Sequence, residues 1–147
     1  MKVKFDRVTI NVRNLETAKQ FFSELLETEF EDLPEEILSG TLKVEYSPPP
    51  DNFGKRRFAI SPVGIELFET EPPVEKEGVR NVMWRVDNLE EAKEEMKRRG
   101  IRHLFDAKCG RWREAIYSAD DMYGVRWVLT EYEGDSVFEA MLKNRRG

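Results

Sequence analysis

The side chains in this sequence that are best equipped for chemistry are arginines and carboxylates. The 147-residue chain has a single histidine, His103, and a single cysteine, Cys109. An intrachain disulfide and a thiolate zinc cluster are therefore excluded. Arginine binds carboxylates and phosphates through a planar fork of N–H donors, and a buried glutamate can act as a general base. Arg7 and Glu66 become the residues of interest once the elements that position them are considered.

The composition places these residues in one mildly acidic domain. The chain has 24 basic and 29 acidic residues, a net charge of −5, and about the length of one ordinary domain. Nucleic acids and anionic membranes need concentrated positive charge, so neither is an expected partner. No apolar run approaches the roughly 18 residues of a membrane helix, and the first residues lack a signal-peptide core. We therefore expect a cytoplasmic protein.

An internal repeat organises the chain. Val8–Lys19 aligns with Val82–Lys93 at an offset of 74 residues, and seven of the twelve aligned pairs are identical. In each copy an alternating apolar stretch is followed by an asparagine, Asn14 or Asn88, which predicts a strand and then a capped amphipathic helix. A Pro-Pro pair among charged residues between the copies indicates a linker over residues 72–77.

Shorter strand patterns follow each helix, so both halves are predicted to be β-α-β-β-β. The expected strands are Glu29–Leu33, Arg57–Ser61 and Ile65–Glu69 in the first half, and Arg102–Asp106, Trp112–Ser118 and Val125–Glu131 in the second. The first half carries extra material over Pro34–Lys55, with an added strand expected at Thr41–Tyr46. A short amphipathic helix is expected over residues 135–146.

Two such halves, each opening with a strand, an Asn-Leu-Glu turn and a helix, resemble the vicinal oxygen chelate superfamily. Its members include glyoxalase I, methylmalonyl-CoA epimerase, extradiol dioxygenases and bleomycin resistance proteins. The resemblance extends over about residues 4–132, and Glu114–Gly124 looks like the family's strand, acidic turn and glycine before its last strand. It implies a single α+β domain in which modules 1–71 and 78–133 form a curved mixed sheet. Helices would cover its convex side, and the active site would lie in the concavity.

The resemblance also implies a divalent metal, held by a histidine on the first strand and a carboxylate on the last strand of each module. Here the histidine positions fall at Arg7 and Asn81. The carboxylate positions fall at Glu66 and Val128, or at Arg126 if the alignment slips by two. Arginine offers no lone pair and valine has no donor atom, so one carboxylate and one amide remain, which make a weak divalent site. We therefore expect that the metal site is lost and that no cofactor is bound.

Strand alternation predicts what lines the concavity in place of a metal. If Val8, Ile10 and Val12 face the helices, the residues between them face the cavity. The same parity on the first and last strands of both modules assigns these residues to the lining: Arg7, Thr9, Asn11, Glu66, Phe68, Asn81, Met83, Arg85, Arg126, Val128 and Thr130. Such a mixture suits a small organic molecule with a carboxylate or phosphate.

Several of these residues have more than one interpretation. Arg7 and Glu66 can form a structural ion pair in the former metal position, or Arg7, Arg85 or Arg126 can receive an anionic ligand. Glu66 can instead act as a general base with a pKa raised by burial, which nearby arginines would oppose.

The remaining aromatic and basic residues are less constrained. Trp84 and Trp127 have the helix-facing parity and are expected in the core, whereas no motif fixes the parity of Trp112 and Tyr117. Three adjacent bases at residues 55–57 are either solvated surface or flank the mouth of the cavity.

Three functions remain open. The first is metal-independent binding of a small organic anion, as the resemblance to bleomycin resistance proteins implies. The second is a divalent-metal-dependent lyase, isomerase or dioxygenase whose non-standard site joins Glu66 with Glu69, Glu131 or Glu133. The third is a structural or regulatory module with a filled concavity. We favour the first, with Glu66 as the candidate catalytic residue if any catalysis remains. We also expect a homodimer, since members of the family commonly pair modules between chains.

Overall fold

One curled, mixed sheet of nine strands organises the computed structural model, which describes residues 1–49 and 54–143. Its strands are β1 (Lys4–Asn11), β2 (Glu31–Asp32), β3 (Glu45–Ser47), β4 (Lys55–Ser61), β5 (Ile65–Glu71), β6 (Gly78–Arg85), β7 (His103–Cys109), β8 (Trp112–Tyr117) and β9 (Trp127–Glu131). The helices are α1 (Leu15–Leu26), α2 (Glu35–Leu38), α3 (Leu89–Arg98) and α4 (Val137–Leu142), with a 3-10 turn at Ala119–Asp121. The strand order is β2-β4-β5-β1-β6-β9-β8-β7-β3. The α+β class and the curved sheet expected from the sequence are confirmed.

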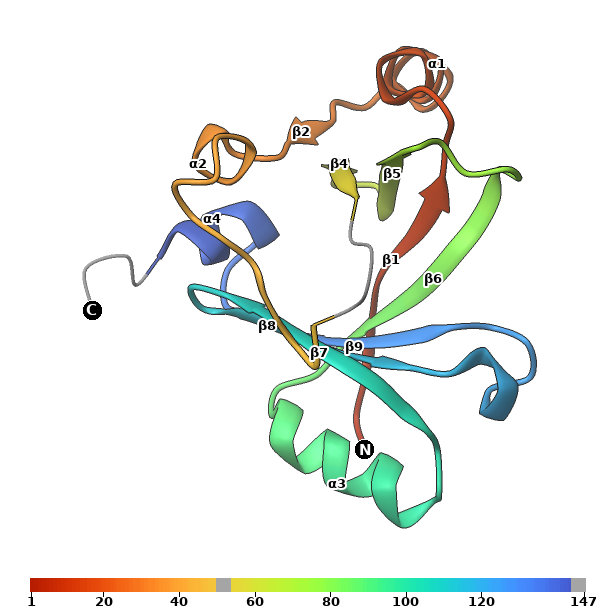
Figure 1. Ribbon diagram of the computed structural model, residues 1–147, viewed down its shortest axis with the longest axis vertical. Helices are drawn as coiled ribbons and strands as arrows, with labels where there is room; N and C mark the ends of the chain where they lie inside the picture. Colours follow the sequence, from red (N-terminus) through yellow and green to blue (C-terminus); the bar gives the residue numbers. More distant parts are fainter. Residues whose placement is uncertain (50–53, 144–147) are drawn as a thin grey trace.

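The repeat explains the centre of this sheet. β1 and β6 are antiparallel neighbours, and each lies parallel to the last strand of its own half, β5 or β9. The helices α1 and α3 follow β1 and β6 and lie at opposite ends of the molecule on the outside of the sheet (Figure 1). The division into modules at residues 72–77 remains a prediction.

Both helices begin as the repeated asparagine predicts. The Asn14 side chain accepts from Thr17 N at 2.9 Å, and the Asn88 side chain accepts from Glu91 N at 3.1 Å. No helix among the described residues has the length and apolarity needed to cross a membrane.

A single stretch of chain joins the two edges of the sheet. β2 pairs with β4 at one edge and β3 pairs with β7 at the other, so residues 33–44 cross the open side (Figure 1). The expected strand at Thr41–Tyr46 thus becomes Glu45–Ser47 and pairs with the second half of the chain, because β7 offers a free edge. α4 packs on the same side, where Phe138 and Met141 are buried. It is shorter than expected, and residues 144–146 of the expected helix lie outside the described residues.

Two irregularities in the central strand pair disturb the simple alternation. Arg7 pairs with Met83 and Phe5 with Trp84, which leaves Asp6 as an extra residue. Arg80 is the matching extra residue in β6, because Asn81 pairs with Thr9 whereas Val79 pairs with Ile10. Such a bulge re-aims the side chains around it. Asp6 and Arg80 are 74 residues apart in the sequence, so the bulge is part of the repeat.

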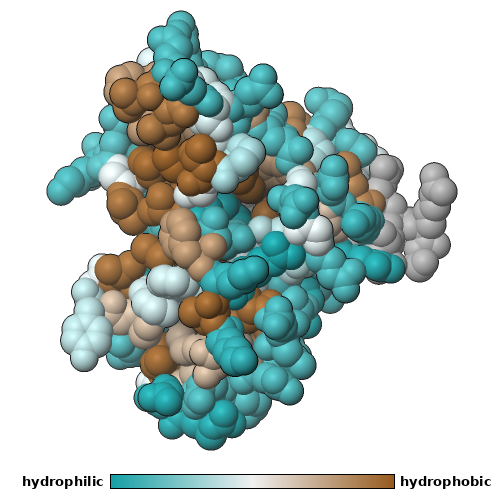
Figure 2. Space-filling view, turned by 180° about the vertical axis from the view of Figure 1, so that it is seen from behind, coloured by the Kyte–Doolittle hydropathy of each residue, from teal (hydrophilic) through white to brown (hydrophobic). Residues whose placement is uncertain are grey.

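The outer face carries a band of apolar side chains, visible through the middle of the surface in Figure 2. Among the exposed apolar residues, Phe5 is 56% exposed and packs edge-on against Trp84, with ring centroids 5.8 Å apart. Trp84 in turn lies 5.2 Å from Trp127, and both tryptophans pack against the buried cluster that includes residues of α3. The two tryptophans thus have the expected helix-facing parity, but they are half-buried and cover the core cluster instead of lying inside it, and Phe5 beside them is exposed.

Candidate functional site

The inner face of the sheet and the crossing segment enclose a small cavity, here called the inner cavity, of about 60 Å³. Its lining residues are Arg7, Val44, Tyr46, Arg56, Phe58, Glu66, Phe68, Arg80, Asn81, Met83, Phe105, Trp112, Glu114, Ile116 and Arg126. Pockets for drug-sized ligands measure about 300–1,000 Å³, and one water-sized sphere takes roughly 10–15 Å³. The inner cavity therefore holds about four water-sized groups.

Some of the predicted lining residues reach this cavity and others do not. Those that reach it are Arg7, Glu66, Phe68, Asn81, Met83 and Arg126. Thr9 and Val128 are fully buried next to it, where Val128 packs with Met83 in one apolar cluster. Asn11 accepts a hydrogen bond of 3.5 Å from Arg80.

Thr130 and Arg85 have other roles. The Thr130 hydroxyl is buried and donates to the carbonyl of Arg113 at 3.4 Å. Arg85 donates to the carbonyl of Tyr132, and its guanidinium lies 3.9 Å from the centre of that ring. Arg85 lines outer grooves instead of the inner cavity, because it is the last residue of β6 and finds its partner just beyond β9.

A buried ion pair occupies the position where the family places its metal. Arg7 Nε donates to Glu66 Oε1 at 2.8 Å, Arg7 also donates to Asp6, and the Thr9 hydroxyl donates to Glu66 Oε2 at 3.2 Å. Burial opposes the charge of Arg7, but the facing carboxylates of Glu66 and Asp6 outweigh it and raise the pKa of Arg7 above its ordinary value. Both Glu66 oxygens are hydrogen-bonded, so this carboxylate is the partner of Arg7 rather than a free base.

The four family positions do not fit a divalent metal. Thr9 on β1 pairs with Glu66 on β5. Met83, which is the counterpart of Thr9 in the second copy of the repeat, pairs with Val128 on β9. Val128 is therefore the counterpart of Glu66, and the slipped alignment to Arg126 is wrong. The set consists of a guanidinium, a carboxylate, an amide and an isopropyl group, and the guanidinium lies 2.8 Å from the only carboxylate.

The alternative acidic site is not formed either. Glu69 Oε2 accepts from Leu15 N at 2.7 Å and Glu131 Oε1 accepts from Leu89 N at 2.9 Å, so both carboxylates serve the starts of helices on the outer side. Glu133 is exposed beyond β9. Within the described parts of the chain, no three His, Cys, Asp or Glu side chains are grouped to hold a metal ion.

Three arginines surround the inner cavity with aromatic neighbours. The guanidinium of Arg80 lies 4.6 Å from the ring centre of Phe68, and that of Arg126 lies 5.5 Å from the ring centre of Phe105. Burial lowers the pKa of Arg80, and burial with repulsion from Arg80 lowers the pKa of Arg126 to about 10. Burial also lowers the pKa of Arg56 to about 10, and repulsion from Arg80 and Arg126 contributes to this shift. An anion between these side chains would relieve that repulsion.

Unpartnered polar atoms are concentrated in the same cavity. Among the described residues, five buried side-chain N or O atoms lack a hydrogen-bond partner, and four of them belong to lining residues: Asn81 Oδ1, Trp112 Nε1, Glu114 Oε2 and Arg126 Nε. Burial raises the pKa of the Glu114 carboxyl to about 8, although the charge of Arg7 opposes this. Buried polar groups are nearly always paired in folded proteins, so this grouping makes the inner cavity the candidate site.

Sequence reasoning missed several of these residues. Strict alternation places Arg80 on the helix side, and the bulge after Val79 brings it to the inner cavity. Trp112 and Glu114 belong to β8, whose parity no motif fixed; the pairing of Ile116 with Val128 would have settled it. Arg56 lines the inner cavity, in agreement with the interpretation that the basic residues 55–57 flank its mouth.

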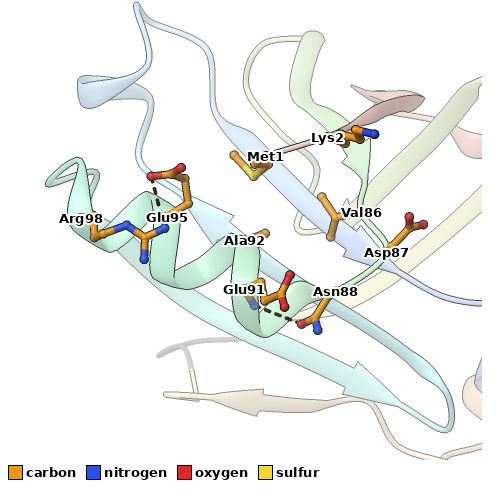
Figure 3. A pocket seen from close by; sticks show the side chains of 9 residues that line it. All are labelled: Met1, Lys2, Val86, Asp87, Asn88, Glu91, Ala92, Glu95 and Arg98. Atoms are coloured by element: carbon orange, nitrogen blue, oxygen red, sulfur yellow. Dashed lines mark hydrogen bonds and ion pairs between the residues drawn. The ribbon is translucent and has the colours of Figure 1, made fainter.

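A second pocket lies outside the sheet, between α3 and the first two residues of the chain, and measures about 380 Å³ (Figure 3). Its polar groups already serve the helix: Asn88 accepts from Glu91 N, and Glu95 pairs with Arg98 at 3.5 Å. None of the unpartnered buried atoms of the described residues belongs to its lining. The inner cavity is therefore the candidate site, although the outer pocket is wider.

Comparison with known proteins gives structural neighbours only. No protein-family model and no curated protein matches the sequence. The hypothetical protein BH1468 from Bacillus halodurans C-125 is 18% identical, over 92% of this chain and 99% of that one, with a TM-score of 0.71. Methylmalonyl-CoA epimerase from Mycobacterium tuberculosis is 21% identical over 88% of both chains, with a TM-score of 0.64.

A variant of the Streptomyces coelicolor epimerase, solved in complex with 2-nitronate-propionyl-CoA, is also similar. It is 16% identical over 91% of this chain and 100% of that one, with a TM-score of 0.67. These neighbours share the vicinal oxygen chelate fold, and at such identities the likeness concerns the fold. The fold implied by the repeated halves is confirmed.

Proposed function

We propose that this chain uses its vicinal oxygen chelate fold to bind a small organic anion in the inner cavity without a divalent metal. The observation that carries the proposal is that four unpartnered buried polar atoms belong to side chains that line the inner cavity. A cavity filled for structural reasons alone would have apolar or mutually paired side chains, because an unpartnered buried donor or acceptor costs about 1–3 kcal/mol.

The charge of the ligand follows from the arginines. Arg7 is neutralised by Glu66 and Asp6, whereas Arg80 and Arg126 face aromatic rings. A carboxylate or phosphate between Arg80 and Arg126 would form charge-assisted hydrogen bonds, including one to the unpartnered Nε of Arg126. A cation would find no free carboxylate among these lining residues, because Glu66 is paired with Arg7 and burial raises the pKa of Glu114.

The size of the ligand follows from the volume. About four water-sized groups fit in the inner cavity. Arg80 and Arg126 remain partly exposed whereas Arg7 is buried, so the two arginines lie toward solvent. The ligand is therefore either a short acid or a larger molecule that inserts a short polar end. The second case would parallel the Streptomyces neighbour, whose ligand is a short acyl-type group on coenzyme A.

A metal-dependent isomerase is less well supported. The epimerase neighbours favour isomerase chemistry by analogy of fold, but one paired carboxylate and one amide do not make a divalent site here. The inner cavity supports binding through this chain's own side chains, and we derive no step through a metal.

The test is a thermal-shift and calorimetric screen of short anions, namely acetate, propanoate, 4-oxopentanoate and phosphate, after treatment with EDTA. We expect at least one of them to raise the Tm of the wild type and of Arg98→Met, a control at an exposed arginine. Arg126→Met should weaken that ligand at least tenfold. The proposal is wrong if no anion stabilises the protein, or if Arg126→Met binds as well as the control.

A further inference from the structure

The inner cavity has two chemically different ends. Asn81 lies on β6 and Arg126 directly precedes the parallel strand β9, where Val82 N donates to the carbonyl of Arg126 at 3.0 Å, and Arg80 directly precedes Asn81. Glu114 pairs with Thr130, four residues beyond Arg126 along β9. At about 3.3 Å per residue, the backbone positions of Arg126 and Glu114 are separated by roughly 13 Å along the strand. The arginines thus enter the inner cavity from one end and Glu114 from the other, and their side chains lie near enough for the charges to act on one another.

The second end offers hydrogen-bond donors. Trp112 and Glu114 are alternate residues of β8 on its cavity face, and each has a buried polar atom without a partner. An indole N–H can only donate. Because burial raises the pKa of Glu114 to about 8, its carboxyl group is mainly protonated at neutral pH and also donates.

The surroundings of Glu114 explain why it remains protonated. The charged groups that act on it are Arg7 and Asp6 on β1, Glu66 on β5 and Arg126 just before β9. Arg80 on β6 and the Tyr46 hydroxyl on β3 also interact with its charge. Arg7 and Arg126 favour ionisation, whereas Glu66, Asp6 and above all burial oppose it. Arg7 is the strongest of the charges that favour ionisation, but it is paired with Asp6 and Glu66, whose own charges raise the pKa of Glu114.

We infer that the ligand carries an uncharged oxygen acceptor, such as a carbonyl, at the end opposite its anionic group, and that Trp112 Nε1 and the Glu114 carboxyl hydrogen-bond this oxygen. The inference rests on the proposed function, because it concerns the same cavity, and it narrows the ligand to an oxo acid or an acid with a comparable acceptor. The anionic group lies at Arg80 and Arg126, and a short carbon chain separates it from the acceptor, because the two groups of side chains enter the cavity from different ends.

The probes are 4-oxopentanoate and pentanoate, which differ by one ketone oxygen. The acetyl end of the first has about the size of the inner cavity, and its carboxylate can remain between the arginines. Calorimetry at pH 6.5 on the wild type should show about tenfold tighter binding of 4-oxopentanoate, equivalent to about 1.4 kcal/mol, a typical hydrogen-bond contribution. Trp112→Phe should reduce this preference to less than threefold. Trp84→Phe is the matched control, because it removes a buried, unpartnered indole N–H outside the cavity.

The pH dependence provides a second, independent readout. Between pH 6.5 and 9 the wild type should lose most of its preference for the ketone, since an ionised Glu114 no longer donates and repels the oxygen. Glu114→Gln retains an N–H donor and should keep the preference at both pH values. Titration of the arginines affects both proteins equally, so it cancels in this comparison.

The outcomes separate the two proposals. Equal affinity of both probes for the wild type, with Arg126-dependent binding, would overturn this inference and leave anion binding intact. A preference that survives Trp112→Phe, or one whose pH dependence persists in Glu114→Gln, would also overturn it. Failure of every short anion to bind would overturn the proposed function, and this inference with it.

Discussion

Replacing Glu114 by glutamine should change how the stability of the protein depends on pH. The buried carboxyl group has a native pKa of about 8, compared with 4.5 for an unhindered glutamate. Between pH 4.5 and about 8, the Glu114 carboxyl is ionised in the unfolded chain but still protonated in the native chain. The unfolded state then binds fewer protons, so the wild type becomes less stable as pH rises, by about 1.4 kcal/mol per pH unit from this group. Over the whole interval the loss amounts to about 5 kcal/mol.

Glu114→Gln lacks this titration and nearly preserves the shape of the side chain. The free energy of unfolding should be measured by urea denaturation at pH 5, 6.5 and 8. As the pH rises from each value to the next, the variant should become more stable relative to the wild type. The difference between the two proteins isolates Glu114, because all other groups titrate alike in both. The same substitution at an exposed position, Glu94→Gln, serves as the control. If the Glu114→Gln difference is also constant from pH 5 to 8, the carboxyl ionises normally and the reasoning fails.

Three further predictions concern the ion pair, the helix caps and the outer face. Arg7→Met should lower the free energy of unfolding by about 3–5 kcal/mol, because it leaves the buried carboxylate of Glu66 without its partner; a loss below about 1 kcal/mol in urea denaturation would contradict the buried pair. Asn88→Ala should cost about 1 kcal/mol through loss of the cap at the start of α3, and an unchanged urea midpoint would refute the cap. We expect the chain to pair as a homodimer across the exposed apolar band, so Phe5→Glu should convert dimers into monomers in native mass spectrometry; a monomeric wild type would rule out this pairing.

The repeat made the centre of the fold predictable. The same asparagine, leucine and glutamate at residues 14–16 and 88–90 predict two strand–helix units, and α1 and α3 begin there. The strand parity of Arg7, Glu66 and Asn81 follows from the alternation around Val8, and six of the fifteen lining residues of the inner cavity could be predicted from the sequence in this way. The ion pair followed because the first and last strands of a module are neighbours.

The remaining lining residues of the inner cavity depend on structural features that strand alternation does not predict. Arg80 reaches the inner cavity through a bulge, and a bulge changes the parity of one residue without leaving a signature in composition. Tyr46 arrives from a segment that crosses to the far edge of the sheet, which is a long-range pairing. Glu114 lies on a strand with aromatic residues on both faces, Trp112 on one and Tyr117 on the other, so periodicity leaves its direction open.

The most direct test of metal-independent anion binding is calorimetry with 4-oxopentanoate on EDTA-treated protein, comparing the wild type with Arg126→Met. The account predicts one ligand per chain for the wild type, unchanged when Mg²⁺, Mn²⁺, Ni²⁺ or Zn²⁺ is added, and at least tenfold weaker binding for the variant. Binding that appears only after a metal is added, or that does not depend on Arg126, would contradict it.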